Sequence, residues 1–467
     1  MIFDNFKKYK EKIALISEDN KTYSYKDILE FKESLKKKFK KRSLTVILSD
    51  NSVESVLVYI SLVILRIPIL LLNSNIRPED LNVILKNYQI QQVLSPKKIK
   101  FKNRHFLKKD IFLENFIFYK AKIIKDVKIH KQLMIVLPSS GTISESKLIK
   151  LSYKNYYFNT ESIIKYLKIS KNDRSITTMP LSYSYGLSVI NSHLMAGGSM
   201  VVGNFSLLDK KFWTLSNFYK LTNINGVPFF YDMFLKIGLN KKLSNKIKFF
   251  TVAGGQLNLF TFKKLSDYLF FKKIKFFLMY GQTEASPRIS YHLLSRKDLI
   301  TRKIPAGKAI PGTKIYLHNK KNQIIKKNNV EGEVIFKGPN IFGGYASNIK
   351  DLSLMKQNKY LRTGDLGIFN NKKILCITGR KSRIVKIYGY RINLDQLESK
   401  INKNKIKKVA CLAKNEKIYI FTEKKINLLK FVDLPNNSFK VVMLKKFPKT
   451  ENGKISYKEL NLLLKND

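Results

Sequence analysis

Apolar runs that alternate with amphipathic helical patterns are the feature that most constrains this chain. Residues 45–48 form a short apolar run typical of a buried strand, and residues 55–65 carry a helical pattern. Residues 67–72 return to an apolar run, which a polar stretch at 73–75 ends. A strand, a helix and a strand in this order pack as parallel strands joined by a right-handed crossover. The chain is therefore predicted to be an α/β protein.

The alternation of strand and helix patterns continues to about residue 95, and short β-rich runs appear from residue 307. A Pro and two acids at residues 77–80 favour the start of a helix that reaches about residue 88, before 93–95 returns to the sheet. From 307 to 369, short β-rich runs are separated by Gly, Asn and Pro, which indicates a small β subdomain. A separate α+β pattern follows a polar, turn-prone stretch. We therefore predict a large domain over 1–381, with layered α/β sheets and a β subdomain, and a small domain over 382–467.

The net charge of +54 over 467 residues requires an explanation. A nucleic-acid-binding protein concentrates Lys and Arg on one face or in a tail, whereas here Lys is spread from end to end beside much Asn, Ile, Phe and Tyr. Those residues share A- and T-rich codons, so genome composition is the simpler explanation. Steering of anionic partners such as ATP, coenzyme A or an acidic carrier protein is the alternative. No nucleic-acid partner is predicted.

The expected compartment is the cytoplasm. The two cysteines, Cys376 and Cys411, are too few for a disulfide framework and lack metal-ligand spacing. The N-terminus shows no signal peptide. Arg66 and Pro68 interrupt the most apolar stretch, 56–72, whereas a membrane span needs about 20 continuous apolar residues. No membrane span is predicted.

A hydroxyl-rich loop follows the apolar run 133–136. Backbone N–H groups and hydroxyls of such a loop can donate to phosphate oxygens, while a lysine adds a point charge. Its spacing differs from the G-x-x-x-x-G-K-[ST] motif, and a plain surface turn is the alternative. The candidate phosphate-binding residues are Ser139, Ser140, Gly141, Thr142 and Lys147.

Two acidic residues are candidates for binding a metal ion or a ribose: one follows a strand-like run, and the other lies in a Gly-flanked turn. Glu284 ends the segment 280–284 directly after the apolar run 276–279, where a carboxylate suits Mg²⁺ held together with phosphates. Asp365 lies in the turn-like segment 360–367 and could accept hydrogen bonds from a ribose diol. A solvated Glu and an ordinary Asx-turn are the respective alternatives.

Two basic residues complete the set of candidates. Arg380 lies in the segment 379–383, at the boundary between the predicted domains. Lys454 follows Asn452-Gly453, a pair that favours a tight turn and would present the lysine on its tip. Among so many lysines, Lys454 stands out only because five such segments occur together in this order.

In this order the segments resemble the adenylate-forming superfamily, which includes acyl-CoA synthetases, peptide-synthetase adenylation domains and luciferase-like ligases. Further matching segments are 180–186, 254–257, 307–312 and 343–345. The resemblance extends from residue 22 to Lys454. It implies an AMP-binding adenylation domain over 1–381 and a mobile C-terminal lid domain over 382–467.

The resemblance implies a two-step reaction. A small-molecule carboxylic acid attacks the α-phosphate of Mg-ATP and pyrophosphate leaves. A thiol, either coenzyme A or the phosphopantetheine of an acyl carrier protein, then takes the acyl group from the adenylate. Transfer to a non-thiol acceptor and a degenerate homologue that binds nucleotide without turnover are the alternatives.

The resemblance also implies residue roles. Ser139 to Lys147 would hold the β- and γ-phosphates, and Thr283 would contact the α-phosphate. Glu284 would ligate Mg²⁺, and Asp365 would hold the ribose hydroxyls. Lys454 would reach the carboxylate and the bridging oxygen. Gly254, Gly255 and Tyr280 would flank adenine, and Arg380 would bind near the ribose and phosphate.

Other implied roles concern domain rotation and the acid. Ser382 matches the hinge, and the loop around Gly389 would approach the thiol's pantetheine arm. Tyr183 and Gln256 would line the acid pocket. Residues 183–185 offer no carboxylate for an α-amino group, which disfavours α-amino acids.

The chain departs from the superfamily pattern in its phosphate loop, where Ser144 and Ser146 replace the usual Gly and Pro. These serines put the flexibility of the loop in question. The amino-acid sequence also resembles that of ligases found with bacterial surface-polysaccharide genes, in residues 182–193, 280–290 and 379–398. Membership of that subgroup would imply that the enzyme activates a short acyl or hydroxyacyl group.

Overall fold

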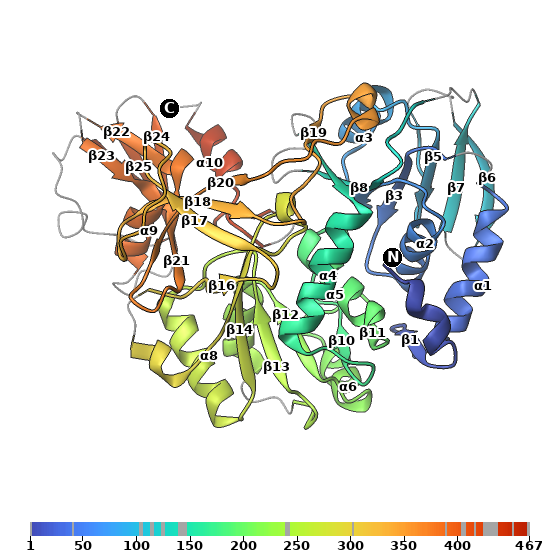
Figure 1. Ribbon diagram of the computed structural model, residues 1–467, viewed down its shortest axis with the longest axis horizontal. Helices are drawn as coiled ribbons and strands as arrows, with labels where there is room; N and C mark the ends of the chain where they lie inside the picture. The colour runs from blue at the N-terminus through green and yellow to red at the C-terminus, as the bar shows by residue number, and fades with distance from the viewer. Residues whose placement is uncertain are drawn as a thin grey trace.

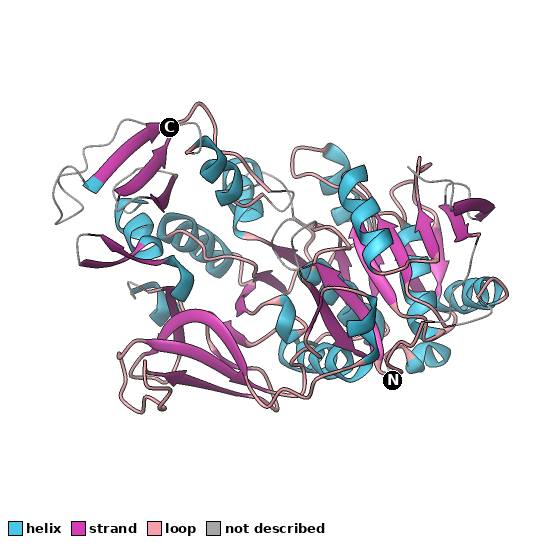
Figure 2. Cartoon of the chain, turned by 90° about the horizontal axis from the view of Figure 1, so that it is seen from above, coloured by secondary structure: helices cyan, strands magenta, loops and turns pink. Residues whose placement is uncertain are grey.

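A computed structural model provides the structure of the chain (Figures 1 and 2). It describes residues 2–39, 42–101, 106–112, 116–122, 127–138, 147–238, 243–300, 303–387, 390–402, 408–414, 417–423, 438–450 and 453–464. These residues form six sheets with helices packed between and around them.

The largest sheet has eight strands in the order β19-β9-β8-β4-β3-β5-β7-β6. Strands β3, β4, β5 and β8 run parallel to their neighbours in this group, and antiparallel strands extend both edges. The strand bounds are β3 Thr45–Ser49, β4 Ile69–Asn73, β5 Gln92–Ser95, β6 Phe106–Phe112, β7 Phe116–Ala121, β8 Leu133–Pro138, β9 Leu148–Ser152 and β19 Tyr345–Ala346.

The central strands and their helices match the predicted rhythm. Strand β3 is buried along its whole length, and α2 (Val53–Ile64) after it is buried on nearly every side, which agrees with its continuously apolar sequence. Ser52 caps the start of α2 by accepting from Ser55 N–H at 3.2 Å. Helix α3 (Pro78–Asn87) has Pro at its start and two acids in its first turn, as predicted.

Two further sheets lie beside the eight-stranded sheet. One has the order β10-β11-β1-β2 and the other β12-β13-β14-β15-β16. Helices α4 (Tyr153–Leu167) and α5 (Ser184–Met195) lie between the eight-stranded sheet and the five-stranded sheet (Figure 1). The strand bounds are β1 Ile13–Ile16, β2 Thr22–Ser24, β10 Arg174–Ile176, β11 Ser199–Val201, β12 Asn223–Gly226, β13 Phe249–Val252, β14 Lys275–Tyr280, β15 Ser290–Leu293 and β16 Lys308–Ala309.

The remaining helices of the first 300 residues cover these sheets. They are α1 Tyr25–Lys36, α6 Lys210–Phe218, α7 Pro228–Met233 and α8 Leu259–Phe271, with the short turns η1 Asp4–Tyr9, η2 Phe234–Gly238, η3 Thr283–Ala285 and η4 Arg296–Ile300. One large apolar core joins α2, α4 and α5 to the strands around them. Among the described residues, no helix is both long and apolar enough to cross a membrane.

A four-stranded antiparallel sheet of order β17-β18-β20-β21 forms the small β subdomain expected from the sequence. Its strands are β17 Lys314–His318, β18 Gly332–Lys337, β20 Leu361–Phe369 and β21 Leu375–Arg380, and η5 Ile349–Ser353 lies before β20.

The chain then passes through η6 (Lys381–Arg383) into the C-terminal unit. This unit contains the hairpin β22 Ile384–Ile387 and β23 Tyr390–Asn393, the strands β24 Val409–Lys414, β25 Lys417–Thr422 and β26 Phe439–Met443, and the helices α9 Leu394–Asn402 and α10 Tyr457–Leu463. It has α+β composition, as expected, and its own small apolar clusters. The boundary between 381 and 382 stays a prediction.

Gly281 is required where the chain turns back after β14. A Cβ atom at this position would lie 1.9 Å from the Pro287 carbonyl oxygen. We expect Gly281→Ala to cost about 1–3 kcal/mol of unfolding free energy, because the backbone must shift to relieve this overlap. Thermal unfolding measures the loss as a lower Tm.

Gly255→Ala is the matched control, since its Cβ would meet Pro228 at 3.3 Å, a far milder contact. Equal Tm values for the two variants would contradict the assigned packing at Gly281.

Candidate active site

A tight loop follows strand β14 and carries Thr283 and Glu284. Gln282 is extended, the short helical turn η3 follows, and Ser286 takes a left-handed conformation at φ 62°. The chain then folds back over Gly281, so both residues lie at the end of a buried strand. This is the position that the sequence predicted for a phosphate- and metal-binding segment.

Two buried asparagines hold this loop. Asn340 Nδ2 donates to the carbonyls of Ala285 at 2.6 Å and Arg288 at 2.9 Å. Asn159 Nδ2 on α4 donates to the same two carbonyls at 3.3 and 3.2 Å. Because both amides are almost fully buried, these hydrogen bonds define the loop conformation closely.

The Thr283 and Glu284 side chains each have one partner from another segment. Thr283 Oγ1 lies 3.2 Å from Ser184 Oγ at the start of α5, and the Tyr345 hydroxyl donates to Glu284 Oε1 at 3.0 Å. In the described part of the chain, no three His, Cys, Asp or Glu side chains gather into a metal site. A single carboxylate still fits Mg²⁺, which takes most of its other ligands from phosphate and water.

Asp365 joins the five-stranded sheet to the β subdomain. The Tyr280 hydroxyl donates to its Oδ2 at 2.6 Å, and Arg380 Nε donates to its Oδ1 at 3.2 Å. Burial raises the pKa of Asp365, although Tyr280 and Arg380 act in the opposite direction. The structure thus brings together three residues that the sequence proposed for adenine and ribose binding.

Tyr183 lies against the turn that follows β13. A Cβ atom at Gly254 would lie only 2.4 Å from the Tyr183 hydroxyl, and Gly254 has φ of +82°. Only glycine permits this close approach without strain. Gly255 and Gln256 are exposed on the same turn. The structure therefore brings Tyr183 and Gly254 into contact, and the role of Gln256 stays a prediction.

The turn that carries Lys454 packs against the large domain. Within this turn, Gly453 N–H donates to Thr450 O at 2.8 Å, and Thr450 N–H donates to Lys454 O at 2.7 Å. The Gly453 backbone lies against the Phe229 ring of α7, and Lys449 Nζ lies 4.0 Å from the centre of that ring. Packing on Phe229 thus determines where the turn presents Lys454.

Lys454 Nζ reaches to 5.9 Å from the centre of the Tyr183 ring. Desolvation lowers the pKa of Lys454, and the guanidinium of Arg380 lowers it further, although part of the lysine surface remains exposed. Lys454 therefore lies over Tyr183, which directly precedes α5, and within electrostatic reach of Arg380 at the end of β21, both of which are distant in sequence.

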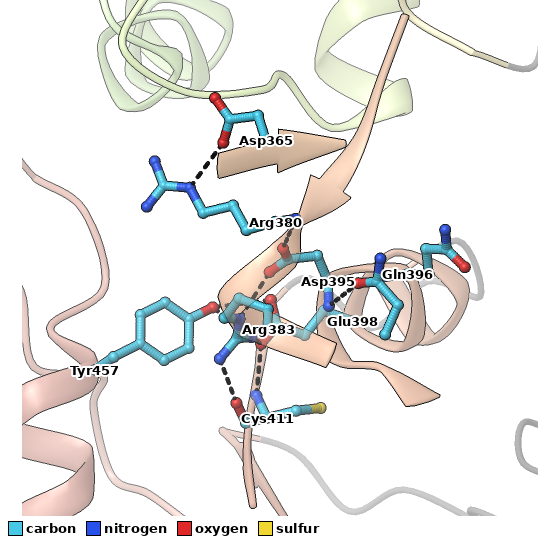
Figure 3. A network of polar contacts seen from close by, with 9 residues as sticks. Asp365, Arg380, Arg383, Asp395, Gln396, Glu398, Cys411 and Tyr457 are labelled. Atoms are coloured by element: carbon cyan, nitrogen blue, oxygen red, sulfur yellow. Dashed lines mark hydrogen bonds and ion pairs between the residues drawn. The ribbon is translucent and has the colours of Figure 1, made fainter. Parts of the chain in front are cut away.

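Ser382 lies at the exposed centre of η6. Arg380 before it and Arg383 after it are held by carboxylates of different parts of the chain (Figure 3). Arg380 points toward Asp365 in the large domain. Arg383 is held in the C-terminal unit by Asp395 through Nε at 2.8 Å and by Glu398 through Nη2. Ser382, the expected hinge residue, thus lies between Arg380 and Arg383, whose side chains are each held by a carboxylate.

Asp395 contacts the residues on both sides of Lys381 and Ser382. Its Oδ2 accepts from the Arg380 backbone N–H at 2.8 Å, while its Oδ1 accepts from Arg383. A second hydrogen bond between the C-terminal unit and the β subdomain lies nearby, where Glu331 accepts from Gln396 Nε2 at 3.1 Å. Both contacts join α9 to the β subdomain in the arrangement that brings Lys454 to Tyr183.

Some expected residues lie outside the described residues, namely Ser139, Ser140, Gly141, Thr142 and Gly389. Lys147 is described and is exposed directly before β9. Sequence reasoning missed several residues that support the site, because each acts through a contact across the fold. They are Asn159, Ser184, Arg288, Asn340, Tyr345 and Asp395.

Known structures with a similar fold span almost the whole chain. The Klebsiella oxytoca NpsA in complex with 3-hydroxyanthranilyl-AMSN has a TM-score of 0.79 at 17% identity, covering 99% of this chain and 98% of that one. The Bacillus subtilis o-succinylbenzoate CoA synthetase in complex with the acyl-adenylate intermediate OSB-AMP has a TM-score of 0.75 at 20% identity, covering 96% and 95%. At these identities the likeness establishes the fold, and it confirms the predicted α/β class.

Curated relatives are named as coenzyme A ligases. The oxalate–CoA ligase of Saccharomyces cerevisiae is 28% identical over 69% of this chain and 61% of its own length. The 2-succinylbenzoate–CoA ligase of Oceanobacillus iheyensis is 22% identical over 83% of this chain and 80% of its own length. The model of a family described as AMP-binding enzyme matches residues 2–346. The chain therefore belongs to the AMP-binding enzyme family.

Proposed function

We propose that this protein is an ATP-dependent acid–coenzyme A ligase that forms an acyl-adenylate. The observation that carries the proposal is the position of Lys454, whose ammonium lies over Tyr183 and within electrostatic reach of Arg380. Thr283 and Ser184 lie beside each other at the start of the same helix as Tyr183. We infer that this cation and these two hydroxyls act on the carboxylate and the α-phosphate that react.

In the first step, a carboxylate oxygen of the acid attacks the α-phosphorus of ATP, and the bond to pyrophosphate breaks. Negative charge builds up on the oxygens around phosphorus as this happens. Lys454 and the Thr283 hydroxyl would stabilise that charge, and such stabilisation is the usual origin of rate enhancement in phosphoryl and nucleotidyl transfer.

The nucleotide would be held by groups that the fold gathers around Asp365. Its carboxylate accepts from Tyr280 and Arg380 and keeps lone pairs for the ribose hydroxyls. Glu284 is the carboxylate that would hold Mg²⁺, which would neutralise phosphate charge. The hydroxyls of 139–142 and Lys147 are proposed to bind the outer phosphates.

Coenzyme A is the proposed acceptor, since the curated relatives are named as coenzyme A ligases. An acyl carrier protein is the alternative, and mass spectrometry of the products formed with each thiol distinguishes them. The cytoplasm stays the proposed compartment, because Cys376 and Cys411 are buried free thiols.

Lys454→Ala should reduce the acid-dependent ATP–pyrophosphate exchange about 10²–10³-fold, because a charge that stabilises the transition state is removed. Exchange with radiolabelled pyrophosphate across a broad panel of carboxylic acids measures the effect. Lys458→Ala on α10 is the matched control, since Lys458 is exposed and lies in the same unit. If no acid supports exchange and hydroxylamine traps no acyl group, the proposed function is wrong.

The lowered pKa of Lys454 predicts a pH dependence. As pH rises through this pKa, the ammonium loses its proton and its stabilising charge, so exchange should fall at a pH below the ordinary lysine value. Lys454→Arg keeps its charge at every accessible pH, so its slower exchange should not show this alkaline fall. The same fall in both proteins would assign it to another group.

The Asp395 contacts predict unequal effects on the two steps. Asp395→Ala removes the acceptor of the Arg380 N–H, while Glu398 still holds Arg383. We expect adenylation to slow about 10-fold, the effect of one hydrogen bond to a charged group, since the arrangement that brings Lys454 to Tyr183 is weakened. Thioester formation from isolated acyl-adenylate should change less.

Single-turnover measurements of each step test this, with Glu459→Ala on α10 as the control for an exposed acid of the same unit. Equal slowing of both steps would show that Asp395 acts only on folding stability.

A further inference from the structure

Arg288 is a buried cation that lacks a protein counter-charge. It follows Thr283 and Glu284 in the segment between β14 and β15 and is 3% exposed. Among the residues that the structure describes, no Asp or Glu forms an ion pair with it. In the same part of the chain, four other arginines each contact a carboxylate, namely Arg77, Arg362, Arg380 and Arg383.

The neighbours of the guanidinium are neutral. It stacks at 4.3 Å from the centre of the Tyr185 ring, and Nη2 donates to Ser188 Oγ over a long 3.3 Å. Nε is buried without a hydrogen-bond acceptor. Burial raises the pKa of Tyr166 to about 12, while the charge of Arg288 and a side-chain hydrogen bond to it act in the opposite direction. The phenols around the guanidinium therefore stay protonated and supply no negative charge.

Burying a guanidinium among neutral groups costs folding free energy unless an anion pairs with it. Arginine cannot shed its proton within a protein, and a buried unpaired charge loses its hydration. Stacking on one aromatic ring offsets only part of this loss. The free Nε and the charge together suit a carboxylate, which accepts from two guanidinium N–H groups at once.

The position of Arg288 relates this missing anion to the acid substrate. Arg288 stacks on Tyr185, and the centre of that ring lies 6.4 Å from the centre of the Tyr183 ring. Lys454 Nζ lies over the ring of Tyr183. Two cations therefore lie against two neighbouring tyrosines: Lys454, on the turn that would meet the reacting carboxylate, over Tyr183, and the buried Arg288 over Tyr185.

We propose that Arg288 binds a second carboxylate of the substrate, so that the enzyme activates one end of a dicarboxylic acid. This inference rests on the proposed function and names its substrate class. The carboxylate that is adenylated lies at Lys454, and the other carboxylate pairs with the guanidinium. Arg288 acts as a specificity residue and takes no part in bond making.

Hydroxamate trapping with matched acids tests the proposal. Wild-type enzyme is offered succinate, glutarate and phthalate, and each acid is compared with its monoamide, which has nearly the same shape without the second charge. We expect kcat/KM to be about 100-fold higher for one diacid than for its monoamide, as for a buried charge pair. Arg288→Met should remove this preference by lowering kcat/KM for the diacid alone.

Arg288→Lys provides a second variant that keeps the charge and should retain part of the preference. The Kd for ATP, measured by calorimetry, and the Tm of each variant report separately on folding. Preference for the monoamides or for short hydroxylated monocarboxylic acids would overturn the inference and leave the proposed function intact. An equal loss of kcat/KM with every acid, in both Arg288 variants, would also overturn the inference. Absence of hydroxamate with every acid would overturn both.

Discussion

The Asp365 carboxylate accepts from Tyr280 on one oxygen and from Arg380 on the other. Tyr280 ends the central strand of the five-stranded sheet, Asp365 lies in the β subdomain, and Arg380 ends the strand that leads into the hinge segment. Because the carboxylate is buried, each partner is needed to offset the loss of its hydration. This one group thus ties the five-stranded sheet to the β subdomain and to the strand that leads into the C-terminal unit.

The C-terminal unit is held at two separate places. Near the chain boundary, Asp395 contacts the backbone of Arg380 and the side chain of Arg383 (Figure 3). Far along the chain, Gly453 and Lys449 pack on Phe229. Both places consist of a few polar or exposed contacts rather than a shared apolar core. Such an interface suits a unit that changes position between two steps of a reaction.

The loop between β14 and β15 serves two purposes through one set of hydrogen bonds. Asn159 and Asn340 hold its carbonyls at Ala285 and Arg288. Thr283 and Glu284 directly precede the first anchored carbonyl, and Arg288 carries the second. The same anchors therefore place both the groups proposed for the reacting end and the cation proposed for the far end of the acid.

The sequence by itself determined the elements and the candidate residues. Apolar periodicity located β3, α2 and β4 to within a few residues, since continuous apolar runs can only be buried. The order of short motifs pointed to Glu284, Asp365 and Lys454, although each alone is an ordinary residue. Contacts between distant segments could not be predicted in this way. The charge of Arg288 is visible in the sequence, but only its tertiary structure leaves it buried among neutral phenols, because burial and pairing depend on which segments meet.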